Sequence, residues 1–272
     1  MTPPIPIAVH GASGRMGQAI LRTVIERDDT QLAAALVRHG SELDGQPLAF
    51  MPGARATGIV YASSMQADIA ASVLIDFSNA AAFDSALDLA LQRRIAFVSG
   101  TTGLDARQRA TFDRAAASIP VLWSANFSLG VALLSRLVAE AARALPEWDC
   151  EIAEAHHNRK QDAPSGTALA LGREVAGARG EDFDAVAKLR ENAPRAPGSI
   201  GFSVTRAGDI VGEHTVLFAT AGERLELTHR ATDRMIFARG AISAARWIAD
   251  RAAGRYTLAG LLDEQPRGRP HP

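Results

Sequence analysis

The first half of the chain alternates between short apolar runs and segments whose apolar residues recur at helical spacing. The apolar runs lie at residues 5–9, 32–37, 72–77, 95–98 and 121–123, and helices are expected between them, at 80–91 and 107–117 among other places. Strands that are separated by helices pair in parallel, because each crossover returns the chain to the same end of the sheet. The sequence therefore predicts an α/β domain with a doubly wound, Rossmann-like parallel sheet.

A glycine-rich segment follows the first strand and leads into a helix; it reads His10-Gly11-Ala12-Ser13-Gly14-Arg15-Met16-Gly17. Glycines let the backbone turn tightly, and the N–H groups and positive dipole end of the helix attract phosphate. The spacing is G-x-x-G-x-x-G rather than the G-x-G-x-x-G fingerprint, and a plain strand-to-helix turn would also fit it. Its position in a parallel sheet favours a bound dinucleotide.

Three more loops of small polar residues follow later strands. They read Asp76-Phe77-Ser78-Asn79, Ser99-Gly100-Thr101-Thr102-Gly103 and Ser124-Ala125-Asn126-Phe127-Ser128. Any one of them is compatible with ordinary turn chemistry. Because ligands of such sheets bind beyond the carboxyl ends of the strands, we expect all four loops to line one crevice.

The residues about twenty positions after the glycine segment bear on the choice of nucleotide, because a carboxylate there binds the ribose of NAD and an arginine accommodates the 2′-phosphate of NADP. The chain has Val37-Arg38-His39 at this place. The expected cofactor is NADPH or NADH, with NADPH slightly favoured. Arg38 as a solvated surface charge is an equal alternative.

The alternation breaks near Leu129, where a second domain is expected to begin. A helix is predicted at 129–145, a strand at 151–157, and then a helix with Pro164 in its first turn. A loop at 188–199 precedes strands at 200–205, 211–219 and 224–230, a helix at 234–253 and a frayed end at 265–272. We expect a dinucleotide-binding domain of residues 1–128 and 241–272, and an α+β domain of residues 129–240 with a mixed or antiparallel sheet.

The segment from Glu154 to Thr167 is dense in reactive groups and reads Glu-Ala-His-His-Asn-Arg-Lys-Gln-Asp-Ala-Pro-Ser-Gly-Thr. Such a run is costly in an ordinary core, because buried charges must be paired. If hydride is added to a C=N or C=C bond, His156 suits proton donation and Lys160 suits stabilisation of the negative charge. Residues 165–167 at a helix start suit an anionic group, most simply a carboxylate.

Other interpretations of this segment stay open at the level of sequence. One histidine could pack in the core while the other is solvated, with Lys160 and Asp162 as a weak surface pair. A metal site is not expected, because adjacent histidines on a strand point to opposite faces and rarely reach one ion.

Composition limits the partners. The net charge is -1 with acidic and basic residues interspersed, so neither nucleic acid nor a membrane is expected, and a small molecule is favoured. Cys150 is the only cysteine, which excludes a disulfide framework, and the N-terminus lacks the pattern of a secretory signal. A cytoplasmic protein is expected.

Taken together, these motifs resemble those of the 4-hydroxy-tetrahydrodipicolinate reductases, also called dihydrodipicolinate reductases. The stretch Glu154-Ala155-His156-His157, with Lys160 and Asp162 to Ala168, is similar to the family's signature, and the four loops resemble its other motifs in order. The resemblance covers nearly the whole chain. It implies reduction of a cyclic dicarboxylate imine, 4-hydroxy-tetrahydrodipicolinate or dihydrodipicolinate, to tetrahydrodipicolinate by NADH or NADPH in lysine (diaminopimelate) biosynthesis.

The resemblance also implies roles for individual residues. It implies that His156 is the proton donor and Lys160 the second catalytic group, and that the substrate is contacted by His157, Lys160, Ser165, Gly166 and Thr167. It implies that the nucleotide is contacted by Gly11, Ala12, Ser13, Gly14, Arg15, Met16, Arg38, Gly100, Thr101, Thr102, Ser124, Ala125, Asn126 and Phe127. Val37 departs from members with an acidic residue there, which puts a preference for NADH in doubt. A homotetramer assembled through the second domain is implied as well.

Two other functions are compatible with the same nucleotide loops, because a fold does not fix a function. One is a different two-domain NAD(P)-dependent dehydrogenase that acts on an amino acid. The other is a non-catalytic protein that binds a dinucleotide and senses redox state. The segment from His156 to Thr167 is the feature that separates them from the reductase.

Overall fold

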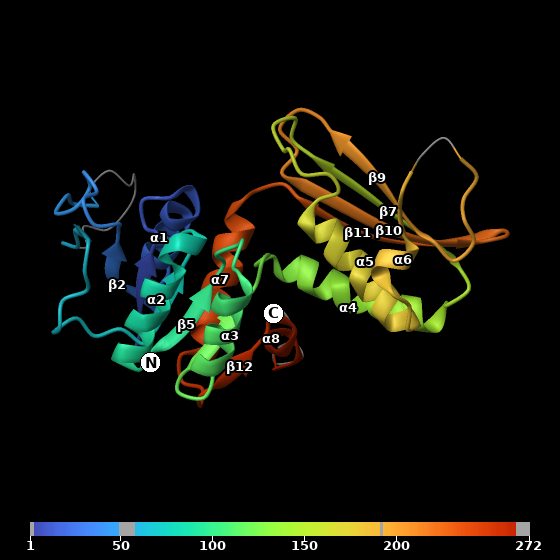
Figure 1. Ribbon diagram of the computed structural model, residues 1–272. Helices are drawn as coiled ribbons and strands as arrows, with labels where there is room; N and C mark the ends of the chain where they lie inside the picture. The colour runs from blue at the N-terminus through green and yellow to red at the C-terminus, as the bar shows by residue number, and fades with distance from the viewer. Residues whose placement is uncertain (1–2, 49–57, 191–192, 265–272) are drawn as a thin grey trace, which may run out of the picture. The chain divides into compact units, whose positions relative to one another are not determined.

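The structure is a computed structural model that describes residues 3–48, 58–190 and 193–264 (Figure 1). The chain divides into two compact units, Met1–Phe127 with Met235–Pro272 (unit 1) and Ser128–Arg234 (unit 2). From the sequence, the chain is expected to rejoin the first domain at residue 241. In the structure, the whole of helix α7 (Met235–Ile248) belongs to unit 1.

Unit 1 is built on a parallel sheet of seven strands in the order β12-β6-β5-β4-β1-β2-β3. The strands are β1 (Ile5–His10), β2 (Thr30–Leu36), β3 (Tyr61–Ala62), β4 (Val73–Asp76), β5 (Ala96–Ser99), β6 (Pro120–Trp123) and β12 (Gly254–Tyr256). The strand order reverses between β1 and β4, which is where such sheets bind ligands. The predicted doubly wound sheet is confirmed.

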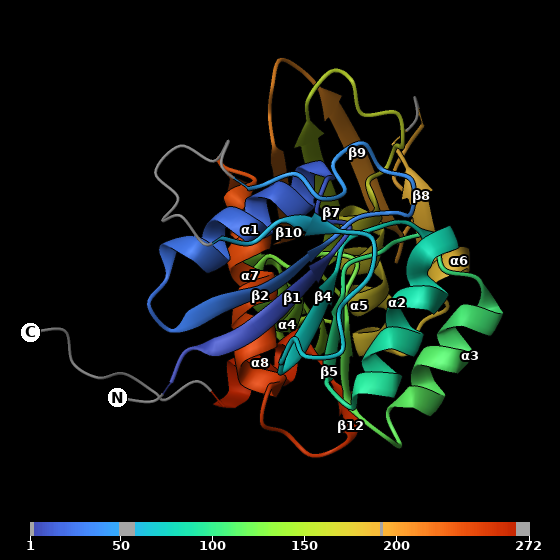
Figure 2. The same ribbon diagram turned by 90° about the vertical axis from the view of Figure 1, so that its left-hand side faces the viewer.

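Helices cover both faces of this sheet, as Figure 2 shows. Helices α1 (Arg15–Glu26) and α7 lie on one face, and α2 (Ala80–Arg93) and α3 (Ala106–Ala115) lie on the other. Ala8, Leu74 and Phe97 are buried against α2 and α3, while their neighbours along each strand face the opposite way. A short helix, α8 (Leu258–Glu264), follows β12.

Unit 2 contains a mixed sheet of five strands in the order β11-β10-β7-β9-β8. The strands are β7 (Asp149–His156), β8 (Ala187–Leu189), β9 (Ile200–Arg206), β10 (Gly212–Thr220) and β11 (Glu223–Ala231). Strand β10 is antiparallel to β7 and β11, whereas β9 is parallel to β7 and β8. Helices α4 (Leu129–Ala144) and α5 (Gly166–Arg179) cover one face over a core that includes Ile152, Val216 and Phe218 (Figure 1), and α6 (Phe183–Val186) follows α5.

Three predictions at the level of elements were wrong. Pro164 is not in the first turn of α5, because Ser165 is the N-cap and the helix begins at Gly166. The expected loop at 188–199 begins as part of β8, since residues 187–189 pair with β9. The last long helix ends at Ile248 rather than 253, because the chain then turns to pair β12 with β6. Residues 265–272, which were expected to fray, lie outside the described residues.

No helix within the described ranges is both long enough and apolar enough to cross a membrane.

Candidate active site

Helix α1 differs from the next five helices at its N-terminus. Its N-cap is Gly14, and no side chain caps the helix. Helices α2 to α6 are each capped by a side chain that accepts a backbone N–H, namely those of Asn79, Asp105, Ser128, Ser165 and Asp182. A helix N-terminus without a side-chain cap suits a phosphate, which can accept from its N–H groups.

Phe77 is the point at which the four polar loops of unit 1 meet. A Cβ atom at Gly11 would lie 2.7 Å from the Phe77 carbonyl oxygen, and one at Gly100 would overlap the Phe77 ring. The rings of Phe77 and Phe127 are 5.3 Å apart. Gly11 also has a φ of 76°, which glycine adopts without strain. The glycines after β1 and β5 are therefore required by close packing of these loops.

A buried carboxylate lies beside this point. Asp76, at the end of β4, is fully buried, and its Oδ1 accepts from the Ser78 hydroxyl at 2.6 Å and pairs with Nδ1 of His10 at 2.9 Å. Its Oδ2 accepts from the hydroxyls of Ser99 at 2.9 Å and Thr101 at 2.8 Å. These donors come from the ends of β1, β4 and β5, so one carboxylate fixes three loops.

The residues expected to contact the nucleotide fall into two groups by exposure. Several are at least partly exposed and available to a ligand, including Ser13, Gly14, Arg15, Arg38, Thr102 and Ala125. The side chains of Ala12, Thr101 and Phe127 are buried, so any contact they make would come from the backbone. Arg38 follows the end of β2 by two residues, close to the predicted strand boundary.

In unit 2, a second buried carboxylate organises the segment that the sequence singled out. Glu154 lies on the face of β7 that the helices cover, and its side chain has 0% exposure. Its oxygens accept from the Arg206 guanidinium at 2.8 Å twice and from the Ser165 N–H at 3.0 Å, and one pairs with Nδ1 of His156 at 2.5 Å. Burial alone would raise the pKa of Glu154, but the Arg206, His156 and Ser165 hydrogen bonds outweigh it, and the pKa is lowered.

His156 is positioned from both sides. Its Nδ1 faces Glu154, and its ring packs edge-on against that of His214, with centroids 5.2 Å apart and an interplanar angle of 75°. Its Nε2 lies beside Gly212, where a Cβ atom would be only 3.0 Å away. Since Nδ1 is occupied by Glu154, Nε2 is the atom that can exchange a proton with a ligand.

Lys160, Arg159 and Arg234 supply a cationic environment around His157, beyond the strand. Lys160 forms an ion pair with Asp162 at 2.8 Å, and its side chain is 21% exposed. Partial burial lowers the pKa of His157, and the positive charges of Arg234 and Arg159 lower it further. An anion would be attracted to this region by the same cations.

A row of polar side chains crosses the sheet at this level. His229 on β11 pairs with His214 on β10, which pairs with Glu154 on β7. Each histidine reaches the N-cap serine of a covering helix through Nε2, His229 to Ser128 at 3.2 Å and His214 to Ser165 at 3.1 Å. Burial lowers the pKa of His229, and burial together with the nearby His156 lowers that of His214 to about 4.

The sequence did not assign roles to several of these residues. It named Asp76 and Glu154 within motifs but gave neither a function, and it did not single out Arg206, Gly212 or His214. The usable signal was the Glu-x-His spacing at 154 and 156, which puts both side chains on one face of a strand. The partners on β9 and β10 lie far along the chain and were not visible from local spacing.

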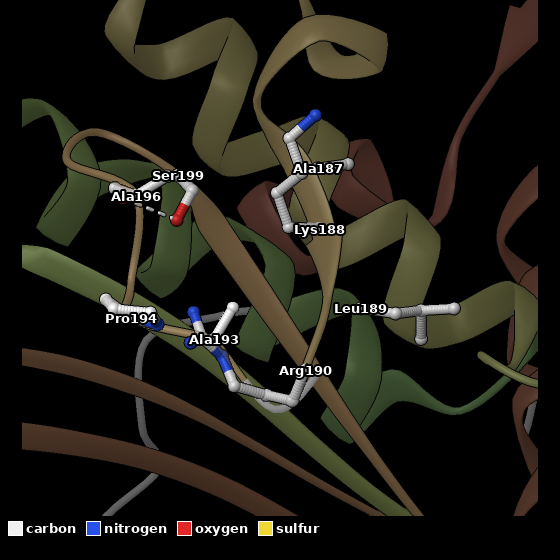
Figure 3. Close-up of a pocket in the computed structure, with 8 residues that line it drawn as sticks. All are labelled: Ala187, Lys188, Leu189, Arg190, Ala193, Pro194, Ala196 and Ser199. Atoms are coloured by element: carbon white, nitrogen blue, oxygen red, sulfur yellow. Dashed lines mark hydrogen bonds between the residues drawn. The ribbon is translucent and has the colours of Figure 1, made fainter.

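One pocket lies apart from the residues around Glu154 and His156. A pocket of about 340 Å³ runs along edge strand β8, between Leu189, Arg190, Pro194 and Ser199 (Figure 3), and contains none of the expected site residues.

Burial raises the pKa of the Cys150 thiol to about 12, so it is no nucleophile at neutral pH. In the ranges that the structure describes, no group of three or more His, Cys, Asp or Glu side chains is arranged to hold a metal ion.

Known proteins are similar to this chain over nearly its whole length. Residues 5–127 match the family model described as dihydrodipicolinate reductase, N-terminus, and residues 130–262 match the one described as its C-terminus. A protein named 4-hydroxy-tetrahydrodipicolinate reductase from Alkalilimnicola ehrlichii is 46% identical over 94% of this chain and 98% of its own length. One of the same name from Cereibacter sphaeroides is 47% identical over 94% and 97%.

Solved structures give the same fold. A dihydrodipicolinate reductase from Paenisporosarcina sp., described as dipicolinate-bound, has a TM-score of 0.77 and 24% identity, covering 96% of this chain and 100% of that one. An amine dehydrogenase from Mycobacterium smegmatis has a TM-score of 0.60 and 10% identity, covering 94% and 95%. At these identities the likeness shows the fold alone.

The low pKa of His214 predicts how unit 2 responds to acid. The unfolded chain protonates an imidazole near its ordinary pKa of about 6.5, whereas folded His214, which faces His156, Glu154, His229 and Lys160, does so at about 4. Its contribution to stability is therefore present above about pH 6.5 and is lost as the pH falls toward 4. Between pH 7 and pH 4.5 this amounts to about 2 kcal/mol.

Urea unfolding at both pH values measures this effect. We expect His214→Gln to lose about 2 kcal/mol less than the wild type on acidification, while the control His39→Gln, at an exposed position, follows the wild type. Equal pH dependence of the wild type and His214→Gln would contradict the prediction.

Proposed function

Because this chain belongs to the dihydrodipicolinate reductase family, we propose that His156 donates the proton in the reduction that the enzyme carries out. The enzyme is an oxidoreductase of lysine biosynthesis that reduces the cyclic imine 4-hydroxy-tetrahydrodipicolinate or its dehydrated form. A bound NADH or NADPH supplies the hydride. The family assignment favours this reaction over amino-acid oxidation and over redox sensing without turnover.

The 2.5 Å hydrogen bond between Glu154 and Nδ1 of His156 carries the proposal. It fixes the imidazole so that a proton on Nε2 is the one available for transfer. Arg206 shares the Glu154 carboxylate and holds it as an anion, so that the carboxylate accepts a hydrogen bond from the ring. Glu154 is therefore a positioning residue that acts through His156.

Lys160 is proposed to stabilise the charge that develops on the substrate as hydride is added. In the structure its ammonium pairs with the exposed Asp162, an interaction that a substrate carboxylate could replace. We place the substrate carboxylates against His157, Lys160, Ser165, Gly166 and Thr167, at the N-terminus of α5. A Cβ atom at Gly166 would meet no other atom within 4 Å, so this end of the helix is open. The dipicolinate bound by the Paenisporosarcina relative has the dicarboxylate chemistry that such a site would take.

The nucleotide is placed in unit 1. The N-terminus of α1, which no side chain caps, suits its pyrophosphate, with Gly11, Ala12, Ser13, Gly14, Arg15 and Met16 around it. The loops after β5 and β6, with Gly100, Thr101, Thr102, Ser124, Ala125, Asn126 and Phe127, are proposed to contact the rest of the molecule. Asp76 positions the β1 and β5 loops from beneath.

Two substitutions test the catalytic roles. We expect His156→Gln and Lys160→Ala to lower kcat by about 10²-fold or more, because each removes a group that acts in the transition state. Affinity for the reduced cofactor should change little. The measurement is oxidation of NADH or NADPH with freshly generated imine, with Lys188→Ala as an exposed control. Unchanged turnover in a folded variant would refute the role of that residue.

We propose that Arg38 gives the enzyme its use of NADPH. It is exposed just beyond β2, at the position where a guanidinium can pair with the 2′-phosphate. Arg38→Ala should raise the KM for NADPH about tenfold, and leave the KM for NADH within about twofold. Arg22→Ala, on the exposed side of α1, is the matched control. An equal change for both cofactors would contradict this role.

We further propose a homotetramer that assembles through the sheet of unit 2. The face of this sheet opposite α4 and α5 presents half-buried Thr215 and Leu217 beside exposed Thr228, and no helix in the described part of unit 2 covers it. Light scattering should give four times the 28.7 kDa mass of one chain. A monomeric mass at micromolar concentration would exclude the assembly.

A cytoplasmic location stays a prediction from the sequence and rests on the single, buried Cys150. Cell fractionation that followed the reductase activity would test it, and activity in a periplasmic extract would contradict it.

A further inference from the structure

The Ser165 hydroxyl is surrounded by two groups that can donate to it. Its oxygen accepts from the Ala168 N–H at 3.2 Å as the N-cap of α5, and it lies 3.1 Å from Nε2 of His214. Ser165 is 2% exposed and His214 is 4% exposed. A hydroxyl has two acceptor positions and one hydrogen to donate, so the direction of the His214 bond decides where that hydrogen goes.

The other nitrogen of His214 settles the direction. Nδ1 is buried and has no hydrogen-bond partner among the described residues. A buried N–H without an acceptor costs more than a bare ring nitrogen, because orphaned donors are the rarer and more costly case. The favoured neutral tautomer therefore carries its hydrogen on Nε2 and points it at Ser165. Burial keeps the ring neutral at physiological pH, since its pKa is lowered to about 4.

We propose that His214 is a positioning residue that directs the Ser165 hydroxyl toward a substrate carboxylate. The Ala168 N–H and the His214 Nε2–H occupy both acceptor positions of Ser165, so its own hydrogen is left to donate to an anion at the start of α5. The inference rests on the proposed function, which places a dicarboxylate there. It adds a residue of β10, outside the signature segment, to the substrate-binding side.

The same ring has a second, separable contact. Its edge-on packing against His156, at 5.2 Å between centroids, limits rotation of the proposed proton donor. The Nε2 atom thus affects substrate binding through Ser165, whereas the ring shape affects turnover through His156. A substitution that keeps one property and removes the other separates the two effects.

Unit 2 provides its own control for this arrangement. His229 bonds the N-cap serine of α4 through Nε2, and its Nδ1 is also buried without a partner among the described residues. Ser128, however, is not in the segment proposed to bind the substrate. Substitution of His229 therefore removes a similar contact between a histidine and a helix cap without touching Ser165.

The experiment compares His214→Phe with His214→Gln. Phenylalanine keeps an aromatic ring against His156 but cannot donate to Ser165; glutamine keeps an amide N–H near the position of Nε2 but removes the ring. We expect His214→Phe to raise the Kd of dipicolinate, measured by calorimetry in the presence of NADH, about tenfold, with kcat within threefold. His214→Gln should give the reverse, a Kd within threefold and a kcat about tenfold lower. His229→Phe should leave the Kd within twofold.

Ser165→Ala provides a second route if His214→Phe does not fold. It should weaken dipicolinate binding at least as much as His214→Phe does, and the double variant should weaken it no further than Ser165→Ala alone, because His214 acts only through the Ser165 hydroxyl. Equal losses of affinity and turnover in both His214 variants, or additive losses in the double variant, would overturn the inference. If the wild type neither bound dipicolinate nor reduced the imine, the proposed function would fail instead.

Discussion

The candidate site of unit 2 depends on the burial of one carboxylate. Glu154 is fully removed from solvent, and an ionised carboxylate in that position must be matched by donors. Its donors come from three places in the chain: His156 on the same strand, Ser165 at the start of α5, and Arg206 at the end of β9. Satisfying this charge therefore brings together the proposed proton donor, the helix end proposed to bind an anion, and a cation that no local motif connects.

Unit 1 uses the same principle for a different purpose. Asp76 is buried at the end of β4 and collects hydroxyl and imidazole donors from three strand ends. In both units a carboxylate on a strand facing the helices fixes the loops or helix ends beyond the sheet. Breaking such a network is expensive, because a charge left without its partners stays buried. The loops and the helix end of each candidate site are thus anchored to the sheet.

Much of this arrangement can be predicted from the sequence. The features that could not be predicted were missed for physical reasons. The periodicity of apolar residues and the turn-forming residues predicted the parallel sheet, the four loops and the helix at 129–145. These features depend on residues that are close together in the sequence. Strands β3, β8 and β12 have two or three residues, too few for a period to appear. His214 and Arg206 lie 49 or more residues from their partners Ser165 and Glu154, and pairing of distant strands places them. Pro164 resembled a helix start because it precedes the true N-cap by one residue.

The row from His229 through His214 to Glu154 limits which insertions and deletions this protein can tolerate during evolution. Side chains alternate between the two faces of a strand, so inserting or deleting one residue within β10 would turn His214 outward and bring its neighbours into the core. The same event would disrupt the apolar packing of Val216 and Phe218. The fold and the proposed active site would be lost in a single step. Length variation among descendants of this sequence should therefore collect in the turns flanking β10, where neither is at stake.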